Sequence, residues 1–104
     1  MVRAVRDHLA DALSTLPALV RDGEDASLHF YFANLASMRK HLFPSLSQAY
    51  QSWVASGDRS PIANLIPVST THWDALAVQM LDVFRSHPED LGASLQNLIG
   101  NSRL

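Results

Sequence analysis

The chain has 104 residues, a net charge of −2 and a hydrophobic share of 47%, which predicts one globular domain over residues 1–104. Its acidic balance and scattered basic residues argue against direct nucleic-acid binding, which usually needs a strong basic patch. The absence of cysteine excludes disulfides and thiolate chemistry and suits the reducing cytoplasm.

Two further features of composition bear on location and association. No apolar run reaches the roughly 20 residues of a membrane span, and the first residues lack the apolar core of a signal peptide. We therefore expect a cytoplasmic protein without a membrane segment. The charged share is 17%, against a typical value of about 25%. Because less polar surface is left to cover the core, self-association or a bound partner is favoured over a free monomer.

The first expected helix runs from about Val2 to Leu16, with apolar residues on one stripe. Pro17 should end or kink it, because proline lacks the backbone donor and clashes with the preceding turn. One further turn can follow from Ala18 to Arg21. Gly23 is expected to end it in the left-handed cap conformation.

The chain is organised around the stretch from Leu28 to Trp53, where apolar residues recur at steps of three and four. The stripe keeps its phase across Pro44, so we expect one long helix kinked there, or two helices stacked end to end. Proline disfavours helical angles in the residue before it, which places the break near Phe43. Asp25 or Ser27 is the expected N-cap. The stripe consists of Leu28, Tyr31, Phe32, Leu35, Met38, Leu42, Leu46, Ala49, Tyr50 and Trp53.

The second half of the chain predicts one short helix and two longer ones, after a stop at Gly57-Asp58. The short helix begins at Ser60-Pro61 and ends at Pro67. Thr71 and Asp74 resemble a capping box that opens a largely buried helix from His72 to Ser86.

A last helix is expected with Ser86 or His87 as its cap, Pro88 at its first position and Gly100 as its stop. The fold class is therefore all-α: a small bundle of four main helices plus a short helix, with a long central helix kinked near Pro44.

No residue set predicts catalysis, a metal or a cofactor. The five histidines lack the spacing of three or four that helical metal sites need, and acidic pairs stand where helix N-termini favour them. Residues Phe30 to Leu35 with His72 downstream resemble single-domain globins, but the chain is too short to wrap haem. We expect no enzyme; if there were one, His72, Asp74, His87 and Glu89 would be the set to inspect.

Partner binding is the more informative expectation. Phe30 is an aromatic residue on an otherwise polar helix face, which indicates either a partner surface or a local contact with the first helix. Arg39 is a charge on the apolar stripe, which either lays its stem along apolar surface or faces a partner. Trp53 would dominate binding if it lay at an interface. The candidate partner-binding residues are Phe30, Arg39, Trp53, Ile62, Leu65 and Ile66, the last three forming either an exposed apolar turn or a lid over the core.

The length, the lack of cysteine, the helical pattern and the long Leu28–Trp53 stretch resemble the QslA-type quorum-sensing antiactivators of Pseudomonas. This resemblance covers size and pattern, and no residue role is carried over. It implies a homodimer that binds the ligand-binding domain of a LuxR-type transcription regulator and blocks its dimerisation and DNA binding. The alternative is a helical accessory or structural module, such as a phage, secretion or immunity protein, that also acts through protein–protein contacts.

Overall fold

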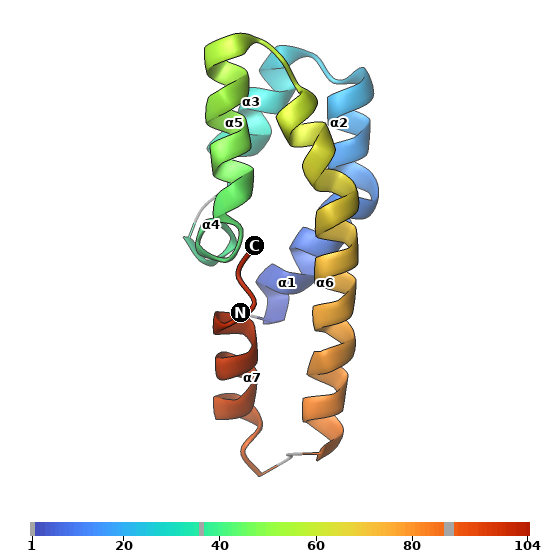
Figure 1. The fold of residues 1–104 in the computed structure, drawn as a ribbon, viewed down its shortest axis with the longest axis vertical. Coiled ribbons are helices and arrows are strands. Elements are labelled where there is room, and N and C mark those ends of the chain that lie inside the picture. The colour runs from blue at the N-terminus through green and yellow to red at the C-terminus, as the bar shows by residue number, and fades with distance from the viewer. Residues whose placement is uncertain (1, 36, 87–88) are drawn as a thin grey trace.

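The computed structural model describes residues 2–35, 37–86 and 89–104, and in these ranges all regular structure is helical. The all-α fold class is therefore confirmed. The molecule is elongated, with principal extents of 48 × 21 × 17 Å (Figure 1). In order, the elements are α1 (Val2–Ala10), the π-helix η1 (Asp11–Thr15), α2 (Leu16–Asp22), α3 (Asp25–Ala33), α4 (Ser37–Leu42), α5 (Pro44–Ser56), α6 (Ser60–Ser86) and α7 (Leu91–Gly100).

Helices α1, η1 and α2 form one continuous helical segment, so of the two expected outcomes at Pro17, an end or a kink, the end is wrong. The π-helix explains how the proline is accommodated. The backbone N–H of Leu16 bonds to the carbonyl of Asp11, five residues back, and this wider turn gives the proline ring room that a regular α-helix lacks. Gly23 ends the segment in an extended conformation (φ −73°, ψ 144°) instead of the expected left-handed one.

The central stretch breaks at Phe43, as expected, and the residue there leaves helical geometry with φ −132° and ψ 64°. A second break, between α3 and α4, was not expected. The expected N-cap is also corrected, because Glu24 occupies that position without a side-chain cap bond.

The two longer helices of this stretch, α3 and α5, lie side by side and antiparallel. The rings of Phe32 and Tyr50 are 4.4 Å apart, and those of His29 and Trp53 are also 4.4 Å apart. Neither a single kinked helix nor end-to-end stacking describes this arrangement, because α4 turns the chain back on itself. Aromatic contacts between the two helices stabilise the fold-back.

The expected burial of the stripe is nevertheless confirmed. Leu35 lies between two helices and is still only 3% exposed. Burial thus followed the spacing of the apolar residues even where the helix itself was interrupted. The buried members are Leu28, Phe32, Leu35, Leu42, Leu46, Ala49 and Trp53, and the half-buried ones are Tyr31, Met38 and Tyr50.

The longest element is α6, which has 27 residues and passes through Pro67 without ending. The expected stop at Pro67 and the new start near Thr71 are therefore wrong. Pro67 is exposed, and the helix bends in this region (Figure 1). The hydroxyls of Ser69 and Thr70 donate to the carbonyl of Ile66 at 3.0 and 2.9 Å, so both side chains bond within the continuing helix.

The C-terminal helix α7 lies beside the second half of α6 (Figure 1). Helix α7 begins at Leu91 after Asp90, whereas the expected cap His87 and first residue Pro88 lie outside the described residues. Gly100 is the last helical residue, as expected. We define the arm as residues 77–86 of α6 together with α7, which run antiparallel to each other in Figure 1.

Candidate functional site

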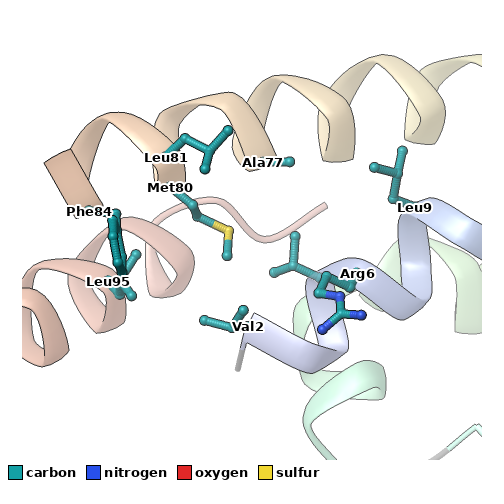
Figure 2. Close-up of a pocket in the computed structure, with 9 residues that line it drawn as sticks. Val2, Arg6, Leu9, Ala77, Met80, Leu81, Phe84 and Leu95 are labelled. Atoms are coloured by element: carbon teal, nitrogen blue, oxygen red, sulfur yellow. The ribbon is translucent and has the colours of Figure 1, made fainter.

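The main candidate site is a groove where the arm meets α1. It encloses about 310 Å³ between the first helix, the end of α6 and α7 (Figure 2). We call it the arm groove. Its lining residues are Val2, Val5, Arg6, Leu9, Ala77, Met80, Leu81, Phe84 and Leu95.

The arm groove is open because the buried core does not extend along α6 beyond Leu76, just before the arm starts. Leu76 is 2% exposed and is the last buried residue of α6, whereas no described residue from 77 to 98 is buried. Leu81 is 55% exposed and Phe84 61% exposed. The expectation of a largely buried helix from His72 to Ser86 is thus wrong for its second half, because only α7 and the start of α1 cover it.

The lining chemistry is almost purely apolar. Arg6 is the single charged residue in the lining, and none of the lining residues is a nucleophile, a carboxylic acid or an imidazole. Such a surface can bind apolar side chains and exclude water, but it offers no acid–base pair for catalysis. A helix with one apolar face is the ligand that fits a groove between helices.

Two of the predicted partner residues, Phe30 and Arg39, meet at a second pocket of about 530 Å³, which we call the Phe30 pocket. Phe30 is 71% exposed, and it shares this pocket with Thr15 and Leu19 of the first helical segment. The remaining lining residues are Thr15, Leu19, Ala26, Ser27, Tyr31 and Asn34.

Arg39 is held by charge and hydrogen bonds at the floor of this region. Its guanidinium forms an ion pair with Asp11, and the Tyr31 hydroxyl donates to the same carboxylate at 2.9 Å. Burial, followed by the negative charge of Asp11, raises the pKa of the Tyr31 phenol above its usual value. The side chains of Arg39 and Asp11 are 25% and 17% exposed, so Arg39 serves an internal ion pair in this structure.

The other predicted partner residues lie in or against the core. Trp53 is 4% exposed and Ile62 is fully buried, whereas Leu65 and Ile66 are half-buried and pack on the core cluster. The turn between Pro61 and Pro67 is therefore a part of α6 that covers the core. These four residues are not brought together with Phe30.

Arg59 links Trp53 to the end of α2 and was not singled out from the sequence. Its guanidinium lies 5.8 Å from the centre of the Trp53 ring and donates to the carbonyls of Leu19, Val20 and Gly23 at 2.8–3.2 Å. It also pairs with Asp25 at 2.6 Å. A cation at these carbonyls compensates the negative end of the helix dipole.

His8 is a buried residue of the core and contacts the rings of Phe43 and Trp73. Its Nε2–H donates to the carbonyl of Arg39 at 2.8 Å, since a carbonyl can only accept. Burial, and to a lesser degree the charge of Arg39, lowers the pKa of this imidazole. At neutral pH His8 is therefore a neutral part of the core.

The residues named for a possible enzyme do not converge. The Nε2–H of His72 donates to the carbonyl of Ser102, Asp74 and Glu89 are exposed, and His87 lies outside the described residues. Within the described ranges, no group of three or more metal-binding side chains is present. In the same ranges, no helix has the length and apolarity to cross a bilayer.

The sequence of the chain matches a known protein family over almost its whole length. The matching description is "Family of unknown function (DUF6866) C-terminal domain", and the match covers residues 1–102. Neither the curated proteins nor the solved structures contain a match.

Proposed function

We propose that the chain, which belongs to the DUF6866 C-terminal domain family, is a non-catalytic module that binds another protein through the arm groove. The observation that carries this proposal is the arm itself, where none of the ten described apolar residues from 77 to 98 is buried. Helices gain most of their stability in proteins by packing an apolar face. A partner that covers this face would supply the packing that the arm lacks.

The fit favours a helical segment of the partner. The arm groove is bounded by helices, and its largest exposed side chains, Leu81 and Phe84, are one turn apart on α6. An amphipathic helix offers apolar residues at the same spacing, so its side chains can interdigitate with them.

Within this class, the resemblance to quorum-sensing antiactivators makes a LuxR-type regulator the first partner to test. A helical inhibitor that covers the dimerisation surface of the regulator would block dimerisation and hence DNA binding. The expected homodimer belongs to the same proposal, as does the cytoplasmic location, which the lack of cysteine favours. A phage, secretion or immunity accessory module would use the same surface with a different partner.

The test is site-specific cross-linking of the full chain in cells. A photoreactive phenylalanine replaces Phe84 in one variant and Val54 in another. Val54 is 57% exposed on α5 and serves as the matched control. We expect a defined cross-linked protein at Phe84 and none at Val54. Equal cross-linking at both positions, or none at Phe84, would overturn the proposal.

The identity of the cross-linked protein separates the alternatives. Recovery of a LuxR-type regulator, followed by loss of its DNA binding when purified chain is added, supports the antiactivator hypothesis. Recovery of a secretion, phage or toxin component supports the accessory module.

A further inference from the structure

The arm groove is an incomplete helical layer. Helix α7 has 10 residues, and residues 77–86 of α6 provide a segment of equal length. Each is about 15 Å long at 1.5 Å per residue. Two antiparallel helices of equal length leave one side open, and a second pair of the same length closes it as a four-helix bundle.

Opposite charges lie at the two ends of the arm groove. Glu89 and Asp90 are exposed at the tip of the arm, where Arg85 on the last turn of α6 is also exposed, so these three side chains carry a net charge of −1. Arg3 and Arg6 are exposed one turn apart on α1, and Arg6 itself lines the groove; with the neighbouring Asp7 their net charge is +1. In the part of the chain that the structure describes, Arg3, Arg6, Glu89 and Asp90 form no ion pair.

This distribution makes the groove complementary to itself. A two-fold axis across the middle of the groove would reverse the direction of the second copy, so that the acidic tip of each arm meets the basic turn of α1 on the other. Each such contact then occurs twice in the dimer, as in every isologous interface. The same charges would repel each other if two arms met tip to tip.

We propose that the occupant of the arm groove is the arm of a second copy of this chain, arranged antiparallel to the first. Phe84 and Leu81 of each copy enter the groove of the other, and Glu89 and Asp90 lie against Arg3 and Arg6. This inference rests on the proposed function, because it concerns the same groove: the second copy is the occupant, and a different protein would have to displace it.

The required interface is modest for this molecule. A standard interface buries about 800 Å² per partner, which is about one eighth of the accessible surface of 6134 Å². Aromatic side chains are enriched among the residues that dominate such interfaces. Phe84 is 61% exposed and lines the tip end of the groove beside Leu95 (Figure 2).

The first experiment measures the mass of the full chain by sedimentation equilibrium over a range of concentrations. We expect a monomer–dimer equilibrium, and Phe84→Ser should raise the dimer Kd by about tenfold or more. Val54→Ser, on α5, should leave the Kd unchanged. Because Phe84 is 61% exposed, its loss should not unfold the chain, and circular dichroism checks this point.

The second experiment tests the pairing of charges. Arg3→Glu with Arg6→Glu makes both ends of the groove acidic, and Glu89→Lys with Asp90→Lys makes both ends basic. Each double variant alone should dimerise at least about fivefold more weakly at low salt. Mixed in equal amounts, the two variants should form heterodimers, because both end contacts again join opposite charges.

The outcomes distinguish this inference from the proposed function. A wild-type chain that stays monomeric up to about 1 mM, or variants that do not recover dimers on mixing, would overturn the antiparallel dimer. If Phe84 nevertheless cross-links to a different protein in cells, the proposed function stands with another occupant. If Phe84→Ser leaves dimerisation unchanged and the photoreactive residue at position 84 cross-links to no protein, both proposals fail.

Discussion

The imidazole ring of His8 is stacked on the indole ring of Trp73, with ring centroids 5.1 Å apart and planes inclined by 15°. Phe43 meets the same imidazole edge-on at 5.3 Å. These contacts join α1, α6 and the break between α4 and α5 at one point. A protonated imidazole would be poorly solvated there, which is the cause of its lowered pKa.

We expect this burial to make folding stability depend on pH. The pKa of His8 is lower in the folded chain than the value of about 6.5 in the unfolded chain. The unfolded chain therefore binds more protons between the two values, so stability is complete above about pH 6.5 and falls as the pH drops toward the folded pKa. Urea midpoints between about pH 7.5 and 5 should fall more steeply for wild type than for His8→Gln, whose amide keeps a donor for the Arg39 carbonyl. Parallel slopes in the two proteins would contradict the assignment to His8.

The burial of Leu35 predicts a large loss on truncation, although the residue lies outside any helix. Leu35→Ala should lower the free energy of unfolding by about 2–5 kcal/mol, since a buried side chain is lost and a cavity is left. Leu13→Ala is the matched control, because Leu13 is 63% exposed and should cost far less. Denaturant midpoints measure both, and equal effects would mean that Leu35 is not a core residue.

Leu35 also shows how far the sequence could predict this fold. Apolar spacing gives the direction in which side chains are buried, and that information survives a break in the helix. It does not distinguish a straight helix from a fold-back, because that choice depends on contacts between distant residues such as His29 and Trp53. The stop expected at Pro67 was also wrong, and at Pro17 the helix continues instead of ending. A bend near Pro67 and a π-turn before Pro17 relieve the clash that the rule for prolines assumes.

The candidate site was less predictable than the core, because its exposure also depends on contacts between residues that are distant in the sequence. Phe30 stood out because its neighbours on the helix wheel are polar, but that pattern left a partner surface and a contact with the first helix equally open. Phe84 and Leu81 look like core residues in the sequence, since the stripe on α6 continues past Leu76 without a change in spacing. Only the number of helices available to cover that stripe reveals its exposure, and this number depends on the whole fold.

The ion pair between Arg39 and Asp11 predicts a coupling that can be measured. Arg39→Met should lower the free energy of unfolding by about 1–3 kcal/mol, because it leaves a mostly buried carboxylate without its counter-charge. Adding Asp11→Asn should recover part of this loss, since the amide can still accept from Tyr31 without a charge. A double-mutant cycle by urea unfolding gives the coupling energy. Strict additivity of the two changes would mean that the pair contributes no mutual stabilisation.

Arg59 predicts a second stabilising contact, at the end of α2. Arg59→Ala removes the donor to three carbonyls and the cation near Trp53, so we expect a loss of about 1–3 kcal/mol. Arg59→Lys should recover only part of it, because an ammonium group cannot reproduce the planar set of donors. Thermal and urea unfolding measure this series. Full recovery by lysine would show that charge alone matters, and the geometry of the guanidinium would then be irrelevant.

The last residues of the described chain predict a local effect on α4. Arg103 donates from Nε to the carbonyl of His41 at 2.8 Å, and the backbone N–H of Leu104 donates to the carbonyl of Leu42 at the same distance. Both acceptors are final carbonyls of α4, which have no partner within the helix. Arg103→Ala should therefore speed hydrogen exchange in residues 37–42 and lower the free energy of unfolding by only about 0.5–1.5 kcal/mol. Exchange along α7 should change little, because its own contacts remain. Unchanged exchange in α4 would mean that this short helix is held by the packing of Leu42 alone, and a uniform increase over the whole chain would mean that the contact supports global stability instead of one helix end.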